Sequence, residues 1–587
     1  MISTLYNLGT KLECRFELLR DLTDRAQSSQ AFYSSWKAVN AFPKIRILAA
    51  KRYIQIQRSS GLFFEALEVA KGVLDLLPSV STRAMKHDDR QEALLAYSGI
   101  AADACALSIQ GGGKSKEHVQ EALKLSESGR GALLNLLLED RIVSNDLQQS
   151  YPEHAAKLDE LKAALNDNSV TATELRTSLQ PPVPPSVLLR AFNECVDEIR
   201  SFEGFQDFMQ APSVEQMQKI AGDGMIVVVN VSDFRSDALL LSTTSISQMQ
   251  LAGFEYPRLR TYVNSGLASI DDVESEEKVG KMNSRFRKFL KWLWQTCVGP
   301  ILERLGYRRQ EAKSTTLPRV WWIGTGVASS LPFHAAGDHF EGSDEHTFNR
   351  IVSSYTPTIR ALIHAKQRAH DSNIRKNCQH RLLLASMSTT PGFTALEGVK
   401  AEALVIKQSL AAGVPITDMP QSNAQTILDA FSRHDMFHFA GHGRSDALDP
   451  GNSCLLLERA GTSGVLLEDP LTVKSLLDLD IQPALLAFLS ACSTAENRAA
   501  LLADEGIHLA SAFVVAGFAN VIASLWPSYD HVCVAIAEGF YSHSKLMNAD
   551  QIDDGTIARA FHTAVQRVYR TSPARPLQWA QYIHVGA

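Results

Sequence analysis

The stretch FHFAGHGRSD, residues 437–446, places an apolar run directly before a histidine that lies between two glycines. The run is typical of a buried β-strand, because strands covered on both faces are apolar at nearly every position. His442 is then expected in the loop at the carboxyl end of this strand. Gly441 and Gly443 allow a tight turn and a close approach of a ligand to the backbone. His438, inside the strand, is expected to be a packed, hydrogen-bonded histidine.

The same pattern extends through residues 317–587, where apolar runs alternate with helical stretches. Strands are expected in RVWWIGTG, HRLLLASM, DMFHFAG, SCLLLE, ALLAFLSA and NVIASLW. Near-continuous apolar strands separated by helices indicate an α/β domain with a mostly parallel, buried sheet flanked by helices. In such sheets ligands bind beyond the carboxyl ends of the strands.

A second strand, PALLAFLSA, leads into CSTAEN, so Cys492 is also expected at the carboxyl end of a strand. Cys492 follows His442 by about 50 residues, the length of one strand–helix–strand unit. Two strands of one parallel sheet could therefore bring the two side chains together. A nearby imidazole lowers the pKa of a thiol, and the thiolate is the competent nucleophile. A histidine followed about 50 residues later by a cysteine is the arrangement of caspase-type proteases.

Several segments together resemble the CHAT family, whose caspase-like domains are often joined to tetratricopeptide repeats. The segments are HFAGHGRSD, FLSACSTAE, DEGIHLASAFVVAGFANVIASLWPSYD and the terminal PLQWAQYIHVGA. VWWIGTGVASSLPFHAAG and SYTPTIRAL resemble early strands of the family, and EALKLSESGRGALLNLLLED resembles the helix before its catalytic half. The resemblance spans roughly residues 190–587 and implies a caspase-like domain that hydrolyses peptide bonds through an acyl-enzyme.

The resemblance also assigns roles to individual residues. Carried over by position, His442 would be the general base and Cys492 the nucleophile. The backbone N–H groups of Gly443 and Cys492 would form the oxyanion hole, and such donors are worth about 3–4 kcal/mol each in acyl-transfer enzymes. The simpler alternative is that Cys492 is one more buried thiol and His442 a turn residue. No metal ligand set and no cofactor motif is expected, because the chain has no zinc spacing, no phosphate-binding glycine loop and no GxSxG.

Six further residues are candidates for lining a pocket or orienting the histidine: Asp446, Ser490, Asp504, Glu505, Trp526 and Asp530. Ser490 stands where metacaspases carry an acid and caspases a glutamine, so neither substrate preference transfers. Asp504 and Glu505 could equally cap the following helix, because acids favour helix N-termini. Asp530 could likewise begin a helix or face the site, and Trp526 could form a pocket wall.

The first 180 residues or so are expected to be helical. The segment GLFFEALEVAKGVLDLLP, residues 61–78, has apolar residues at helical spacing. Its small residues Gly61, Ala66 and Ala70 fit the packing positions of tetratricopeptide repeats, although a plain helical bundle is the alternative. Stacked helical pairs leave a concave face that commonly binds peptides, so a regulatory protein partner is expected there.

Three parts of the chain are expected. The proline-rich QPPVPPSV, residues 180–187, marks the end of the helical region 1–180. Residues 181–316 should hold a helix over 187–203, a short β-hairpin, and a long helix over 282–306 that Pro300 kinks. Residues 317–587 form the α/β domain.

Composition argues against several classes of protein. The net charge is −6, and no basic stripe suggests a nucleic-acid or membrane-surface protein. Eight cysteines are few for a chain of 587 residues, which favours reduced thiols and a cytoplasmic location. They form no CxxC motif, which argues against zinc ribbons and redox motifs. The apolar window LASAFVVAGFANVIASLW, residues 509–526, is as long as a membrane span. Because Gly517 interrupts it, a buried helix followed by a buried strand is expected instead.

The sequence therefore predicts a caspase-like cysteine endopeptidase that acts on a protein or peptide and is controlled by a partner on its helical repeats. The alternative is a catalytically silent scaffold whose repeats bind protein partners. An esterase or transferase that uses the same two residues is a third possibility.

Overall fold

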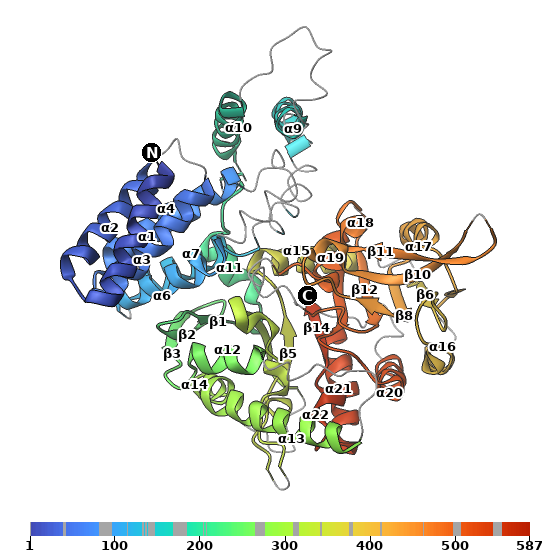
Figure 1. Ribbon diagram of the computed structural model, residues 1–587. Helices are drawn as coiled ribbons and strands as arrows, with labels where there is room; N and C mark the ends of the chain where they lie inside the picture. Colours follow the sequence, from blue (N-terminus) through green and yellow to red (C-terminus); the bar gives the residue numbers. More distant parts are fainter. Residues whose placement is uncertain are drawn as a thin grey trace. The chain divides into compact units, whose positions relative to one another are not determined.

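The chain divides into two compact units, Met1–Val214 and Glu215–Ala587. The computed structural model (Figure 1) describes the chain except for residues 1, 39–42, 81–96, 114, 132–133, 135–137, 139–146, 149, 168–184, 204, 207, 265–275, 309–315, 341–342, 375–379, 411–413, 462, 480, 497–505 and 544–554. The proline-rich stretch lies largely outside the described residues. The expected boundary at 316 falls inside the second unit, because one sheet uses strands from both sides of it.

The described secondary structure of the first unit is helical, as predicted. Consecutive helices pack on one another from α1 to α7, and small residues permit their close approach. Ala66 and Ala70 of α4 are fully buried, and a Cβ on Gly72 would lie 3.0 Å from the Trp36 ring. The assignment to tetratricopeptide repeats stays a prediction. The helices are α1 (Ile2–Leu19), α2 (Leu22–Lys37), α3 (Pro43–Ser59), α4 (Phe63–Val80), α6 (Ile100–Gly112), α7 (Lys116–Ser128), α9 (Pro152–Asp167) and α10 (Pro185–Arg200).

The described strands of the second unit form a main sheet of 11 strands. Strands β1, β4, β5 and β14 run parallel to one another, and β13, β12, β8, β6 and β7 form a second parallel set. The two sets meet where β14 pairs antiparallel with β13. The order is β3 (Ile246–Gln250), β2 (Ser236–Leu241), β1 (Met225–Val231), β4 (Arg319–Gly324), β5 (Val352–Tyr355), β14 (Tyr582–Gly586), β13 (Phe518–Ser524), β12 (Ala484–Ser490), β8 (Met436–Ala440), β6 (Leu382–Ser386) and β7 (Ile416–Pro420).

Helices cover both faces of the second parallel set, which confirms the predicted fold class. Neighbouring residues of β8 show the two faces, because side chains alternate along a strand. Phe437 stacks on Phe513 of α19, whereas His438 contacts Glu402 of α16 and Tyr541 of α20. The helices are α15 (Ile359–Ile374) and α19 (Leu509–Ala516) on one side, and α16 (Glu397–Ser409) and α20 (Asp530–Tyr541) on the other, whereas α21 (Thr556–Thr571) packs on α20 and against β5 and β14.

A second, smaller sheet follows β8. It contains β9 (Gly443–Arg444), β10 (Cys454–Ala460) and β11 (Leu466–Thr472), all antiparallel. The SCLLLE segment was expected in the main sheet, but it forms β10 of this small sheet. Its apolar side chains are buried there just as they would be in a central strand, so the sequence pattern could not tell the two sheets apart.

Two further predictions can be compared with the structure. The helix expected over 282–306 is α13 (Glu276–Leu293), a π-helical turn (Trp294–Val298) and α14 (Gly299–Arg304). Pro300, which lacks an N–H, is the second residue after this turn. The apolar window forms α19 and β13, separated by Gly517 at φ 130°. Among the described helices, none is long and apolar enough to cross a membrane.

Candidate active site

His442 and Cys492 occupy equivalent positions on neighbouring strands. Strands β8 and β12 are parallel, and Ala440 is paired in register with Ser490. Each candidate residue lies two positions beyond its member of this pair, past the carboxyl end of its strand. The Gly441 N–H donates to the Ser490 carbonyl at 3.2 Å, so the ladder continues into the loops. The two loops therefore leave the sheet side by side.

The backbones of the two loops are in contact at Gly443. A Cβ on this glycine would lie 2.6 Å from the carbonyl oxygen of Cys492 and 3.3 Å from the Cβ of Ala491. Such a separation is shorter than van der Waals contact, so only glycine permits this approach without a shift of backbone. The tight turn inferred at this glycine thus brings the histidine loop against the cysteine loop. The oxyanion hole assigned to the Gly443 and Cys492 amides stays a prediction.

Buried hydrogen bonds from the end of β13 hold the turn that carries Cys492. Ser493 adopts a positive φ of 58°, which is uncommon for a residue with a side chain. The Ser524 hydroxyl donates to the Ala491 carbonyl at 2.6 Å, and the Ser524 N–H donates to the Thr494 hydroxyl at 2.9 Å. Ser524 and Thr494 are fully buried. The end of β13 therefore fixes a strained turn that presents the partly exposed cysteine.

A backbone carbonyl in the loop after β6 orients the His442 ring. Its Nε2 lies 2.8 Å from the carbonyl oxygen of Thr394, and its ring lies 5.0 Å from that of Phe393. A carbonyl can only accept a hydrogen bond, so Nε2 must carry the proton. In the neutral ring the lone pair is then on Nδ1, which becomes the nitrogen that can take up a proton. The sequence analysis missed Thr394, because a backbone carbonyl leaves no signal in residue type.

Two buried cysteines, Cys454 and Cys533, have thiols whose pKa is raised, whereas a reactive thiol needs a lowered pKa. Burial raises the pKa of the Cys533 thiol to about 12, and it also raises the pKa of Cys454. Both thiols stay protonated near neutral pH, and they lie on α20 and β10. His438 is fully buried between Glu402 and Tyr541, with 3.1 Å to each, which confirms that it is a packed, hydrogen-bonded histidine.

The other candidate residues serve the surrounding framework. Ser490 is buried, and its hydroxyl lies 3.3 Å from that of Tyr582. Trp526 is also buried, donates to the Leu577 carbonyl at 2.9 Å and packs edge-on against Phe286. These contacts therefore place both side chains in the core behind the strand ends.

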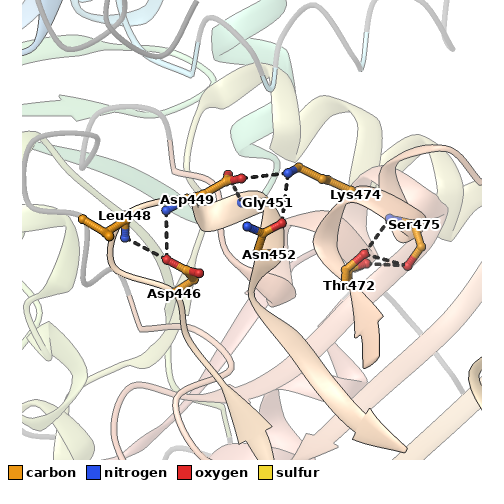
Figure 2. A network of polar contacts seen from close by, with 8 residues as sticks. All are labelled: Asp446, Leu448, Asp449, Gly451, Asn452, Thr472, Lys474 and Ser475. Atoms are coloured by element: carbon orange, nitrogen blue, oxygen red, sulfur yellow. Dashed lines mark hydrogen bonds and ion pairs between the residues drawn. The ribbon is translucent and has the colours of Figure 1, made fainter. Parts of the chain in front are cut away.

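Asp446 organises the loop between β9 and β10 (Figure 2). Its Oδ1 accepts the N–H groups of Leu448 and Asp449 at 2.8 and 2.9 Å, which lowers the pKa of the Asp446 carboxyl. Asp449 in turn binds Lys474, whose ammonium also donates to Asn452. Asp446 therefore shapes the chain that leads away from His442.

Asp504 and Glu505 lie outside the described residues. The residue that caps α19 is His508, whose Nδ1 accepts the Ser511 N–H at 3.2 Å while the Ser511 hydroxyl accepts the His508 N–H. Asp530 is the first residue of α20, and its Oδ2 accepts the Gly398 N–H of α16 at 2.9 Å. Within the described ranges, no group of three or more His, Cys, Asp or Glu side chains is placed to hold a metal ion.

Comparison with known proteins bears on the family and the fold. The CHAT domain model matches residues 287–587, and no curated protein matches the sequence. Two crystal structures of the Saccharomyces cerevisiae separase–securin complex, at 3.0 and 2.6 Å resolution, are similar with TM-scores of 0.52 and 0.51 at 10% and 9% identity. They cover 98% and 99% of this chain, which spans 44% of each matched chain. The Arg-specific cysteine proteinase gingipain R gives a TM-score of 0.33 at 14% identity, covering 52% of this chain and 74% of the proteinase.

Proposed function

Because this chain belongs to the CHAT-domain family, we propose that it is a cysteine endopeptidase that cleaves peptide bonds through Cys492 and His442. The main support is the placement of both residues two positions beyond the paired Ala440 and Ser490 on neighbouring parallel strands. A thiol and an imidazole so placed are the minimum set for nucleophilic acyl transfer.

In the proposed reaction, His442 Nδ1 takes the proton from the Cys492 thiol, and the thiolate sulfur attacks the carbonyl carbon of the scissile bond. The N–H groups of Gly443 and Cys492 stabilise the negative oxygen of the tetrahedral intermediate. Collapse of the intermediate breaks the C–N bond, and the imidazolium gives its proton to the leaving amine. Water then attacks the acyl-enzyme with His442 as base, which releases the carboxylic acid product and restores the thiol.

The carbonyl of Thr394 supports this cycle without taking part in bond changes. It holds the Nε2–H of His442 at 2.8 Å, so the ring keeps one tautomer and one orientation. When the ring becomes an imidazolium, the same carbonyl accepts a stronger, charge-assisted hydrogen bond. The ring is therefore stabilised in its charged form, which a general base needs.

We further propose that a protein partner on the N-terminal helices controls the peptidase. The structurally similar separase was crystallised in a complex with securin. In this chain, the helices from α1 to α7 pack consecutively and would offer the partner their concave face. A cytoplasmic location, in which thiols remain reduced, is part of the same proposal.

The experiment is to measure the alkylation rate of each cysteine by iodoacetamide against pH, read by peptide mass spectrometry. Wild type and His442→Ala are compared, and Cys533 and Cys454 serve as internal slow references. Cys492 should react fast near neutral pH in the wild type and at least about 10-fold more slowly in the variant, because an adjacent imidazole lowers a thiol pKa.

A second measurement separates a peptidase from a scaffold. A peptide library of random sequence is incubated with wild type and with Cys492→Ala, and new peptide termini are identified by mass spectrometry. Cleavage by the wild type alone supports the endopeptidase. A Cys492 that reacts no faster than Cys533, together with no cleavage, supports the scaffold and contradicts the proposal.

A further inference from the structure

The loop that carries Thr394 runs from β6 to α16 and is tied to the sheet at its start. The Met387 N–H donates to the Ala440 carbonyl at 2.8 Å, and the Leu396 N–H closes the loop on the Ser388 carbonyl at 2.9 Å. Thr394 itself is exposed, and it reaches His442 through a main-chain atom. The position of that carbonyl therefore depends on how firmly the far end of the loop is held.

The far end of the loop is the N-terminus of α16, which lacks a cap of its own. The N-cap residue is Leu396, whose side chain has no oxygen to accept the first N–H groups of the helix. Asp530 supplies the missing acceptor from a segment 132 residues away, through its Oδ2 on the Gly398 N–H. A Cβ on Gly398 would lie 2.5 Å from that of Asp530, so glycine permits this close approach.

Asp530 is itself placed by a fixed element. It begins α20, which packs along α16, so its carboxylate lies at the N-terminal ends of two helices. Both helix dipoles favour a negative charge there. The first turn of α20 is anchored through Cys533, whose sulfur lies 2.9 Å from the Ser528 hydroxyl and 3.2 Å from that of Tyr582.

We infer that Asp530 is a positioning residue for His442, acting through Gly398 and the carbonyl of Thr394. By holding the start of α16, it keeps that carbonyl on Nε2 and so leaves Nδ1 as the basic nitrogen. This inference rests on the proposed peptidase function. It adds Asp530, which follows β13 along the chain, to the groups that orient the general base His442. Loss of the Asp530 bond should loosen the Thr394 segment and let the imidazole turn or change tautomer.

A purely structural role for Asp530 makes a different prediction, and one matched variant separates the two. Asp469 also binds the start of a helix from a distant segment: its Oδ2 accepts the Ala424 N–H at the start of α17, at 2.6 Å. Asp469→Ala removes this carboxylate from a helix that does not carry the Thr394 loop and that keeps its own N-cap, Asn423, whose Oδ1 accepts the Thr426 N–H. It controls for the loss of a distant carboxylate acceptor at a helix start in this unit.

The experiment uses the full chain and the pH profile of Cys492 alkylation by iodoacetamide, with thermal unfolding measured on the same samples. Asp530→Ala and Gly398→Ala should slow Cys492 alkylation at pH 7 by about 3- to 10-fold, the rate factor that corresponds to the free energy of a typical lost helix cap. Both variants should also shift the midpoint of the pH profile toward that of His442→Ala. Asp530→Asn keeps an oxygen acceptor and should lie between Asp530→Ala and wild type. Asp469→Ala should keep the wild-type profile.

The outcomes separate this inference from the proposed function. If His442→Ala differs from wild type while Asp530→Ala and Gly398→Ala do not, the pairing of Cys492 with His442 stands and the positioning role is refuted. The same holds if both variants only lower the unfolding temperature, as Asp469→Ala would, with the midpoint unmoved. If His442→Ala itself has the wild-type profile, the proposed function fails and the inference fails with it.

Discussion

Replacing Gly443 with alanine should damage the candidate site more than the fold. The new methyl carbon would lie 2.6 Å from the Cys492 carbonyl oxygen, a backbone atom that cannot rotate away. Ordinary van der Waals contact needs about 0.6–0.8 Å more, so one of the two loops must move by that amount. Overpacking of this kind costs about 1–3 kcal/mol of folding free energy. A misplacement approaching 1 Å in an active site costs about 100-fold in rate, so the chemistry should suffer far more.

The assay compares the rate of Cys492 alkylation and the free energy of unfolding in urea for wild type and Gly443→Ala. The matched control is Gly280→Ala in α13, where a Cβ would meet nothing within 4 Å. That change should stabilise the helix by up to about 1 kcal/mol and leave Cys492 untouched. If Gly443→Ala matches wild type in both measurements, the two loops do not touch as described, and the reasoning that places the dyad is wrong.

Three further predictions concern the framework around the site. Glu402→Ala should lower the free energy of unfolding by about 1–3 kcal/mol in urea titrations, because it leaves a ring nitrogen of the fully buried His438 without its hydrogen-bond partner. Ser524→Ala should cost about 1–3 kcal/mol by leaving the buried Ala491 carbonyl unsatisfied, and Cys492 alkylation should slow as its turn loosens. Stability should also fall steeply with acid, since burial lowers the pKa of several histidines below their unfolded value of 6.5. Because the unfolded chain then binds more protons than the folded chain, each such histidine lowers the free energy of unfolding by about 1.4 kcal/mol per pH unit, from below pH 6.5 down to its folded pKa. A urea midpoint that does not change between pH 7 and pH 5 would contradict this. The histidines are His334 and His339, with a pKa of about 3, and His508 and His562, with a pKa of about 4.

Local patterns in the sequence were enough to place the two candidate residues at strand ends. The apolar runs before His442 and before CSTAEN form β8 and β12, because a strand buried on both faces must be apolar throughout. The same reasoning separated α19 from β13 at Gly517 in a window as long as a membrane span. These features depend on residue type and spacing along the chain, which the sequence contains directly.

Only the tertiary structure decided which strands are neighbours. The pairing of β8 with β12, whose last register pair lies two positions before the candidate residues, joins segments that the sequence merely shows to be about 50 residues apart. The terminal segment forms β14 in the middle of the sheet, and the SCLLLE segment leaves the main sheet for a small one. Strand order is set by contacts between distant segments. Strands that are equally apolar would be buried equally well in several different orders, so their sequences do not select one.

The groups that support His442 were also beyond sequence reasoning. Every residue has a main-chain carbonyl like that of Thr394, and every residue but proline has a main-chain N–H like that of Gly398, so no residue type marks them. Asp530 was visible as a candidate, but its partner on α16 was not. The sequence determined which side chains could do the chemistry, and the packing of distant segments decided what holds them in place, because hydrogen bonds to the backbone depend on position rather than on identity.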